Sequence, residues 1–323
     1  MKEDALVAAI RALVEPPIGR SIVLGIGDDA AVWQPSRSHR SVVTSDMLVE
    51  GVHFTRALMT LEDAGWRAMT ANASDVAAMG ARPVLATVSL GMPEGTSEAD
   101  VRELYRGIAG SSRAAGLNVV GGDLSRAPAL TIAITAVGEV RASNVKTRAG
   151  GRPGAVLAVT GALGAARAGL DAASGRIAIE GALAERALRA FRRPLARCAE
   201  GRYLGASANV QAMMDLSDGL STDLDRLCAA SGCGASLENV PVAEAARAAA
   251  ATAGSDPEHY ALAGGEDFEL LVAIAPRAFG HLAARFRERF GRELLRVGTL
   301  RAQPGIEFRG ERIERTGWEH FAT

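Results

Sequence analysis

The sequence predicts an α/β (α+β) protein of two domains, and three observations support this. The chain has 323 residues, more than one typical hydrophobic core organises. Segments with strand-like alternation interleave with segments of helical periodicity along its whole length. A polar stretch rich in Gly and Pro, residues 146–154, separates two such series. We therefore expect one domain over residues 1–148 and a second over residues 149–323.

The first domain should contain three helices and several strands. Ser97 followed by Asp100 is a capping box, and Gly116 is suited to end the helix that this box begins. Apolar periodicity and breakers predict helices over 4–14, 61–79 and 97–115, and strands over 41–44, 84–90, 119–120 and 130–140. The polar residues after 44 and after 120 are expected to leave their strands as loops.

The second domain repeats this alternation, with a strand entering a Gly/Asp loop that a helix follows. We expect strands over 155–160 and 269–274, a strand that ends at 213–214, and terminal strands beyond 290. Helices are expected around 164–170, 181–190, 194–204, 220–230 and 277–290.

Bulk composition excludes several classes of partner. The formal net charge is -1, with 48% hydrophobic and 23% charged residues, so nothing draws the whole molecule to nucleic acid or to an anionic membrane. No apolar run approaches the ~20 residues that a membrane span needs, and acidic residues interrupt the N-terminal apolar segment. Three cysteines in no C-x-x-C pattern suit a reducing compartment, so we expect a cytoplasmic protein.

Acidic residues recur beside glycines and other small residues at predicted element ends. A single such cluster is explained by turn preference. Several that converge would repel one another unless a hard cation neutralised them, and Mg²⁺ binds one or two carboxylates together with phosphate oxygens. The pattern therefore predicts a phosphate site with several Mg²⁺ ions, built from clusters at Asp28/Asp29, Asp46, Asp75, Asp123, Asp215/Asp218 and Glu266/Asp267.

Other common nucleotide and catalytic motifs are absent from the sequence. There is no G-x-x-x-x-G-K-[ST] loop, and Gly25-Ile26-Gly27 lacks the third glycine of a dinucleotide-binding fingerprint. There is also no H-R-D, D-F-G, G-x-S-x-G or H-E-x-x-H motif.

The ordered set of motifs resembles the thiamine-monophosphate kinase family over about residues 24–318. The set consists of Gly25-Ile26-Gly27-Asp28-Asp29, Thr44-Ser45-Asp46 with Glu50-Gly51-Val52-His53-Phe54, Ala73-Ser74-Asp75, Gly121-Gly122-Asp123, Asp215-Leu216-Ser217-Asp218-Gly219 and Gly264-Gly265-Glu266-Asp267-Phe268. Each motif is weak alone, but their order is specific.

This resemblance implies the fold of the wider aminoimidazole-ribonucleotide synthetase-like superfamily. The N-terminal domain would bind ATP and magnesium and form a homodimer through a shared β-barrel, and the C-terminal α/β domain would complete the site. The implied reaction is phosphoryl transfer from ATP to thiamine monophosphate, the final step of thiamine diphosphate formation.

The resemblance also implies roles for individual residues. Metal ligands would be Asp29, Thr44, Ser45, Asp46, Asp75, Asp123, Asp215 and Asp218, with Asp28 either a ligand or, preferably, a helix cap. ATP would contact Tyr105, Gly122, Asp123, Arg148 and Ser217, and thiamine monophosphate would contact His53, Glu266 and Trp318. Structural alternatives are a core position for Tyr105, His53 and Trp318, and a solvated linker charge for Arg148.

No general base is assigned, because a phosphate monoester is already largely dianionic at neutral pH. Within the superfamily, selenophosphate synthetase is disfavoured because every cysteine lies beyond residue 197. The two Glu/Gly motifs at 50–54 and 264–270 also fit the thiamine enzyme better than aminoimidazole-ribonucleotide synthetase. A non-catalytic sensor would show a loss of ligands, and no such loss is seen. A metal-dependent phosphohydrolase usually has a His-rich or D-x-D nucleophile site, and only His53 lies near an acidic cluster.

Overall fold

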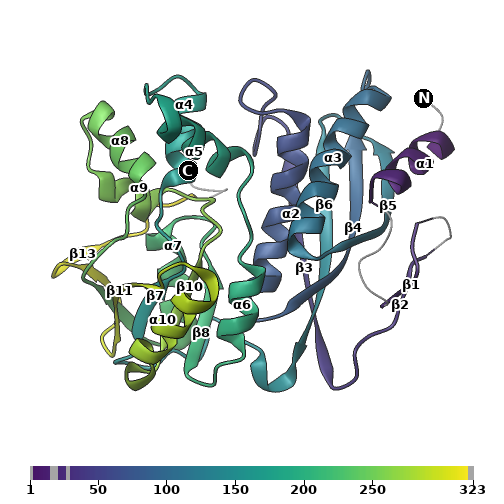
Figure 1. Ribbon diagram of the computed structural model, residues 1–323. Coiled ribbons are helices and arrows are strands. Elements are labelled where there is room, and N and C mark those ends of the chain that lie inside the picture. Colours follow the sequence, from purple (N-terminus) through teal and green to yellow (C-terminus); the bar gives the residue numbers. More distant parts are fainter. Residues whose placement is uncertain (1–2, 15–20, 27–29, 319–323) are drawn as a thin grey trace. The chain divides into compact units, whose positions relative to one another are not determined.

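The computed structural model describes residues 3–14, 21–26 and 30–318, and for residues 3–5 only the backbone. The chain divides into two compact units (Figure 1), an N-terminal unit of Met1–Val76 with Ala81–Ser143 and a C-terminal unit of Ala77–Gly80 with Asn144–Thr323. The division after residue 143 lies shortly before the boundary expected after residue 148. The mixed α/β class is confirmed.

The N-terminal unit is built on a four-stranded sheet in the order β3-β6-β4-β5. Its strands are β3 (His39–Val49), β4 (Arg82–Met92), β5 (Asn118–Arg126) and β6 (Thr131–Arg141). Strand β6 pairs antiparallel with both β3 and β4, whereas β4 and β5 are parallel. The short strands β1 (Ile22–Leu24) and β2 (Val32–Trp33) form a separate antiparallel pair.

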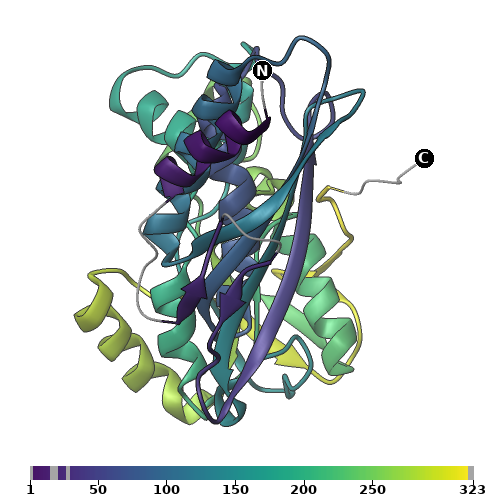
Figure 2. The ribbon, with the colours of Figure 1, turned by 90° about the vertical axis from the view of Figure 1, so that its right-hand side faces the viewer.

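Helices α2 (Leu61–Ala78) and α3 (Glu98–Ala115) cover one face of this sheet (Figure 1). They approach closely because glycines lie at the contact: a Cβ on Gly107 would fall 1.8 Å from the carbonyl oxygen of Glu62, and one on Gly65 2.1 Å from that of Leu104. The predicted capping box of α3 is confirmed, since Ser97 and Asp100 bond reciprocally. Helix α1 (Glu3–Val14) lies beside α3 (Figure 2).

The opposite face of the sheet is only partly covered. Strands β1 and β2 place Trp33 against a small apolar cluster at Leu85 and Val137. The buried Glu139 carboxylate ties this layer together, because it accepts hydrogen bonds from Trp33 Nε1 at 3.3 Å and from the Ser36 backbone N–H at 2.8 Å. Farther along the same face, Val43 and Met47 of edge strand β3 are 65% and 55% exposed.

Two polar motifs lie inside strands, where the sequence predicted loops. Ser45 and Asp46 continue within β3, and Gly121-Gly122-Asp123 within β5. Both strands are sheet edges, so each needs a hydrogen-bonding partner on one side only, and glycines and polar side chains are tolerated there. The prediction that every acidic cluster lies at an element end was therefore wrong for Asp46 and Asp123. It was also wrong for Asp75, which lies inside α2.

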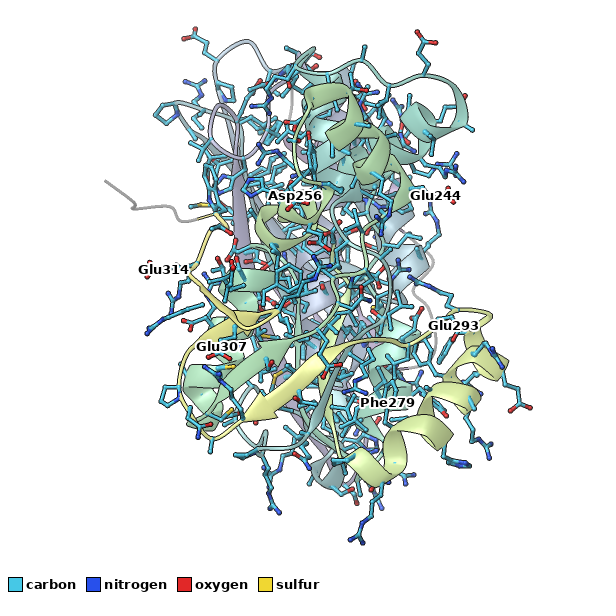
Figure 3. All side chains as sticks on the ribbon, turned by 90° about the vertical axis from the view of Figure 1, so that its left-hand side faces the viewer. Glu244, Asp256, Phe279, Glu293, Glu307 and Glu314 are labelled. Atoms are coloured by element: carbon cyan, nitrogen blue, oxygen red, sulfur yellow. The ribbon has the colours of Figure 1, made fainter. Side chains whose placement is uncertain are left out.

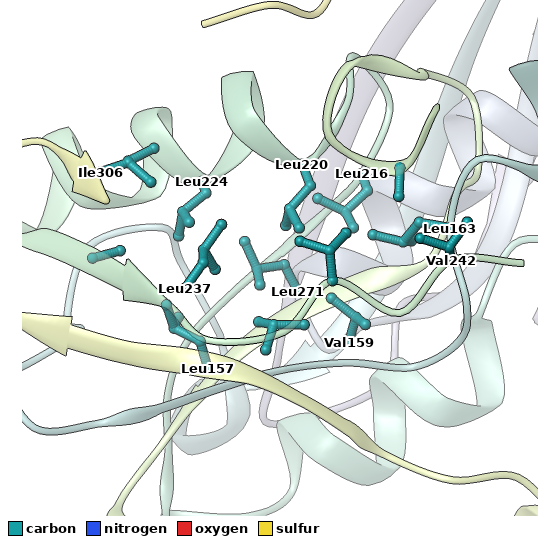
Figure 4. Close-up of a cluster of buried hydrophobic side chains, with 14 of the residues drawn as sticks. Leu157, Val159, Leu163, Leu216, Leu220, Leu224, Leu237, Val242, Leu271 and Ile306 are labelled. Atoms are coloured by element: carbon teal, nitrogen blue, oxygen red, sulfur yellow. The ribbon is translucent and has the colours of Figure 1, made fainter. Parts of the chain in front are cut away.

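The C-terminal unit contains a seven-stranded sheet in the order β13-β12-β9-β11-β7-β10-β8. Its strands are β7 (Val156–Val159), β8 (Val210–Asp215), β9 (Gly234–Leu237), β10 (Leu270–Ile274), β11 (Leu295–Arg301), β12 (Ile306–Phe308) and β13 (Glu311–Ile313). Among the described strands of this sheet, β12 and β9 are the one parallel pair, and the other neighbours are antiparallel. Leu157, Val159 and Leu271 from the sheet meet Leu220 and Leu224 in the core (Figure 4).

Seven helices of this unit are described: α4 (Ala165–Ala173), α5 (Gly181–Arg192), α6 (Cys198–Gly205), α7 (Leu220–Ser231), α8 (Glu244–Ala253), α9 (Pro257–Ala263) and α10 (Pro276–Phe290). Helices α8 and α9 were not predicted from the sequence. Both are short, but Asp256 accepts a hydrogen bond from the Glu258 N–H at the start of α9, a capping signal that was overlooked. Glu244 and Asp256 mark the starts of these two helices in Figure 3.

Candidate functional site

In the N-terminal unit, three predicted ligands lie between β3 and α2. Thr44 and Asp46 are two residues apart on β3, so their side chains share the face that α2 covers. The Thr44 hydroxyl donates to the Asp75 carboxylate at 2.5 Å, and the Asp46 backbone N–H donates to Asn72 Oδ1 at 3.2 Å. Asn72 and Asp75 are three residues apart on α2 and therefore neighbours on its surface. This arrangement brings two carboxylates and a hydroxyl together where α2 lies against β3, and we call this place the seam between β3 and α2.

The chemistry of this donor set fits Mg²⁺. Carboxylate and hydroxyl oxygens are hard ligands, and Mg²⁺ commonly takes one or two carboxylates and leaves its other positions to water or phosphate. Among the described residues there is no group of three or more His, Cys, Asp or Glu that could hold a metal by themselves. Water or phosphate oxygens would complete the coordination of a cation at this seam.

Ser45 and Asp123 lie on the opposite face of the sheet. Ser45 pairs in register with Thr135, whose hydroxyl donates to Ser45 Oγ at 3.2 Å. Asp123 is on β5, three strand spacings from β3, which is about 14 Å. It accepts a hydrogen bond from Ser125 Oγ at 2.7 Å. Within this unit, neither residue joins Asp46 and Asp75.

Two expected nucleotide contacts have structural explanations. Tyr105 is 2% exposed in the core of the unit, and burial raises the pKa of its hydroxyl, so its placement favours the alternative of a core tyrosine. Gly122 is exposed, but a Cβ there would lie 1.9 Å from the Val88 carbonyl oxygen. The close approach of β4 therefore requires this glycine even without a ligand.

His53 lies in the turn that follows β3. Its Nδ1 accepts the backbone N–H of Val49 at 3.0 Å, so the turn fixes the orientation of the half-buried ring. Gly51, with φ at +87°, allows the chain to reverse there. Asp28 and Asp29 lie outside the described residues.

In the C-terminal unit, the two acidic loop motifs pair with each other through their backbones. Leu216 N–H donates to the Glu269 carbonyl at 2.8 Å, and Phe268 N–H donates to the Leu216 carbonyl at 2.9 Å. Glu266 N–H donates to the Ser217 carbonyl at 2.7 Å. These bonds extend the β8–β10 pairing beyond the regular strands, so Asp215, Ser217, Asp218 and Glu266 gather at one end of the sheet.

The loop that carries Glu266 is held in a strained conformation. Glu266 and Phe268 have φ angles of +66° and +49°, a left-handed region that L-residues other than Asn and Asp rarely adopt. Gly265 between the two motifs is required by space, because a Cβ there would lie 2.5 Å from the Ser217 carbonyl oxygen. Non-glycine residues in such conformations often mark functional sites, where surrounding contacts hold them in place.

Apolar anchors and one buried carboxylate fix the loop that carries Ser217 and Asp218. Leu216 and Leu220, on either side of it, insert into the core (Figure 4). Asp223, in the first turn of α7, accepts the backbone N–H groups of Ser217 at 3.0 Å and Asp218 at 2.9 Å. Burial raises the pKa of the Asp223 carboxyl to about 6.

Arg226, one helical turn farther along α7, pairs with both acids of this loop. Its guanidinium bonds to Asp223 Oδ1 at 2.8 Å and also to the Asp218 carboxylate. A cation bound at Asp218 would compete with Arg226 for this carboxylate.

Two acidic residues that follow Glu266 connect this loop to neighbouring segments of the unit. Asp267 accepts the Gly164 N–H at 2.7 Å and so caps α4 from a distant part of the chain. Glu269 is buried and bonds to Arg197 at 2.6 Å and Arg292 at 2.8 Å. Burial alone would raise the pKa of Glu269, but these two guanidinium groups hold it below its usual value.

The remaining two predicted site residues, Trp318 and Arg148, lie at different distances from the loop that carries Asp218. Trp318 is 54% exposed, and its backbone N–H donates to the Asp218 carbonyl at 3.1 Å, which places it beside the acidic loop. The Arg148 carbonyl instead accepts a hydrogen bond from Ser231 at the last turn of α7. That end is about 18 Å, one length of a 12-residue helix, from the end that follows Asp218. Within this unit, Arg148 therefore lies away from the loop.

Three residues, Asn72, Asp223 and Asp267, have positioning roles that were not predicted from the sequence. Asp223 had a detectable signal, because an acid in the first turn of a helix is well placed to accept N–H groups of the preceding loop. Asp267 was noted within its cluster but not given a role, since its partner Gly164 is 103 residues away.

Comparisons with known proteins show the family of this chain. The AIR synthase related protein family matches twice, with its N-terminal domain over residues 27–140 and its C-terminal domain over residues 152–311. A thiamine-monophosphate kinase of Synechococcus elongatus is 34% identical over 311 residues, which cover 92% of this chain and 91% of that protein.

Solved structures agree with this placement. The crystal structure of thiamine-monophosphate kinase from Stenotrophomonas maltophilia has a TM-score of 0.86 at 33% identity and covers 97% of this chain and 98% of that one. AaThiL complexed with AMPPCP and TMP has a TM-score of 0.79 at 30% identity and covers 99% of this chain and 97% of that one.

Proposed function

The chain belongs to the thiamine-monophosphate kinase family of AIR synthase related proteins, and we propose that it transfers the γ-phosphoryl group of ATP to thiamine monophosphate. The observation that carries this proposal is the match to such kinases at about a third identity over nearly the whole chain. A related structure binds AMPPCP, an ATP analogue, together with TMP. The enzyme is a phosphotransferase, and ATP is its phosphoryl donor.

We assign the seam between β3 and α2 to the phosphates of ATP. Asp46 and Asp75 would hold Mg²⁺ there with the Thr44 hydroxyl, and Asn72 positions Asp46 through its backbone N–H. When bound by these residues, Mg²⁺ would supply positive charge to offset that of the phosphates, as in other phosphoryl transfers. Asp29, Ser45 and Asp123 remain further candidate ligands, Asp123 and Gly122 remain candidate ATP contacts, and Arg148 a candidate phosphate contact.

The loops of the C-terminal unit suit the acceptor and the transferring phosphoryl group. Asp215, Ser217 and Asp218 lie at one end of the sheet, where Asp223 fixes the backbone of the loop. Glu266 carries a negative charge that complements the cationic thiazolium of thiamine monophosphate, and the exposed Trp318 ring can stack on its heteroaromatic rings. His53 remains a further candidate contact to this substrate.

No side chain is assigned as a general base. The attacking oxygen belongs to a phosphate monoester that is already largely dianionic at neutral pH, so it has no proton that must be removed. The barrier to overcome is repulsion between two anions. Two unit charges 4 Å apart repel by about 4 kcal/mol at an effective dielectric constant near 20. The acidic residues serve this need indirectly, by holding the cations that offset the repulsion.

We also propose that the enzyme is a homodimer formed through edge strand β3 and the exposed part of the sheet face beside it. Val43 and Met47 are exposed there on an eleven-residue edge strand. Long edge strands with exposed apolar residues tend to pair with another chain. A Met47→Lys variant should shift the protein from dimer to monomer in light scattering coupled to size-exclusion chromatography, and a monomeric wild-type protein would contradict the proposal.

We place the enzyme in the cytoplasm. Its three cysteines are buried, and none forms a disulfide within the described part of the chain, as expected in a reducing compartment. Within the described part of the chain, none of the helices combines the length and the apolar character that crossing a membrane requires.

A direct assay tests the catalytic proposal. Purified protein is incubated with ATP, Mg²⁺ and thiamine monophosphate, and the products are separated by chromatography. Thiamine diphosphate and ADP should form in equal amounts, chelation of Mg²⁺ should stop the reaction, and added Mg²⁺ should restore it. Hydrolysis of ATP without thiamine diphosphate would refute the assignment.

A further inference from the structure

The last described residues run back across the start of α7 and bond to it. We call Thr316–Trp318 the C-terminal strap. The Gly317 N–H donates to Thr222 Oγ1 at 3.0 Å, and the Trp318 N–H donates to the Asp218 carbonyl at 3.1 Å. The backbone of Trp318 is thereby attached to the loop that carries Ser217 and Asp218. Glu314, just before the strap, is labelled in Figure 3.

Ser221 connects the strap to the second acidic loop. Its hydroxyl donates to the Leu262 carbonyl at 3.0 Å, shortly before the loop that carries Glu266. The same oxygen accepts from the Thr316 N–H at 3.2 Å and from Thr316 Oγ1 at 3.0 Å. A serine hydroxyl has one proton and two lone pairs, so this side chain is fully used. Ser221 is 1% exposed, which leaves these contacts shielded from competing water.

Gly317 lets the strap lie this close to the loop. A Cβ at this position would fall 2.0 Å from the Asp218 carbonyl oxygen and 2.5 Å from Thr222 Oγ1. Real Cβ contacts are never this short, and the Asp218 carbonyl is backbone that cannot move aside like the end of a flexible side chain. Any side chain at residue 317 must therefore lift the strap from α7.

We infer that the strap is a positioning element for the acceptor substrate, with Gly317, Ser221 and Thr222 as its positioning residues. These residues do not touch the substrate. They fix the Trp318 backbone relative to the Asp218 loop, and thus where the exposed indole ring meets a heteroaromatic acceptor. This inference rests on the proposed function, because it assigns the strap to the thiamine monophosphate side of the site rather than to ATP.

The first test compares two glycine substitutions by steady-state kinetics. In the Gly317→Ala variant, the KM for thiamine monophosphate should rise roughly tenfold, the scale of one lost ring-stacking contact. The KM for ATP and the melting temperature should stay near their wild-type values. The control is Gly280→Ala in α10, where nothing lies within 4 Å of the added Cβ, and it should leave both KM values unchanged.

A second pair of variants removes the hydrogen bond without adding bulk. Thr222→Val keeps the side-chain volume but loses the acceptor for Gly317 N–H, whereas Thr222→Ser keeps the hydroxyl. Thr222→Val should raise the KM for thiamine monophosphate in the same direction as Gly317→Ala, and Thr222→Ser should restore it. A general loosening of the fold would instead raise both KM values and lower the melting temperature.

A double-mutant cycle then asks whether the strap acts through Trp318. Gly317→Ala and Trp318→Ala should be non-additive, with the double variant no worse than Trp318→Ala alone. Additive effects, or an unchanged KM for thiamine monophosphate in Gly317→Ala, would overturn the inference. A wild-type protein that makes no thiamine diphosphate would instead refute the proposed function, so the two failures are distinguishable.

Discussion

Because the backbone of Glu266 is left-handed, replacing this residue by glycine should give a more stable protein than replacing it by alanine, the reverse of the usual order. At an ordinary position, replacing alanine by glycine destabilises a protein by about 0.5–1 kcal/mol, because glycine loses more conformational freedom on folding. At φ of +66°, an alanine side chain retains the steric conflict of an L-residue, about 1–2 kcal/mol, and glycine removes it. The Glu266→Gly variant should therefore be more stable than Glu266→Ala.

The expected difference is about 0.5–1 kcal/mol, the steric conflict that glycine relieves minus the entropy that it loses. For a folded unit of 150–250 residues, 1 kcal/mol corresponds to a shift of about 2–4 °C in melting temperature. Both variants keep the bond from residue 266 N–H to the Ser217 carbonyl and both lose the Glu266 carboxylate. Their difference in stability therefore isolates the backbone conformation.

Thermal unfolding and steady-state kinetics should be measured on the same preparations. Both Glu266 variants should show a raised KM for thiamine monophosphate by about the same factor. Ser38 is a matched control, since it has φ of +64° in an exposed turn of the N-terminal unit. Ser38→Gly should exceed Ser38→Ala in stability without any kinetic change. If Glu266→Ala proves more stable than Glu266→Gly, the strain argument is wrong.

Two further predictions concern acidic residues. Asp46→Ala or Asp75→Ala should lower kcat by at least about 100-fold, since a bound metal contributes several kcal/mol to transition-state stabilisation, while circular dichroism and melting temperature stay near wild type; normal turnover in either variant would remove the seam between β3 and α2 from the metal assignment. Glu269→Gln should destabilise the protein by about 3 kcal/mol at pH 7, because it leaves the partly buried Arg197 guanidinium without the buried carboxylate that it pairs with. The folded-state pKa of Glu269 is lowered below 4.5, so its contribution is present above pH 4.5 and is lost as pH falls below that value. Urea unfolding at pH 7 and pH 3.5 should therefore show the deficit of Glu269→Gln shrinking at the lower pH, and a deficit equal at both would contradict the ion-pair interpretation.

Local sequence signals predicted most helices correctly, because each of these signals lies within a few residues of the element it marks. The Ser97/Asp100 capping box and Gly116 define both ends of α3. The same signals failed for β3 and β5. Their polar and glycine residues resemble loops, but pairing with β6 and β4 continues through them. Whether a strand tolerates such residues depends on whether it is an edge, and strand order is a property of the whole sheet.

In the candidate site too, the sequence predicted individual residues, whereas the structure shows which of them meet. Asp46 and Asp75 were predicted individually, but their meeting depends on α2 packing against β3, 26–31 residues away along the chain. Ser45 shares a motif with its neighbours, yet strand alternation puts its side chain on the other face. The role of Asp267 as a cap for α4 required a contact over 103 residues.

The sequence alone determined the class of fold and the ordered motifs that identify the family, because these are patterns along the chain. It also determined the chemistry available, a set of hard oxygen donors with no candidate base. The tertiary structure decided which of those donors meet, that Tyr105 is a core residue, and that the strap bonds to α7. Such facts depend on strand order, on the face to which each side chain points and on the close approach that glycine permits. No local pattern of residues encodes these, because each is a relation between segments that only folding brings together.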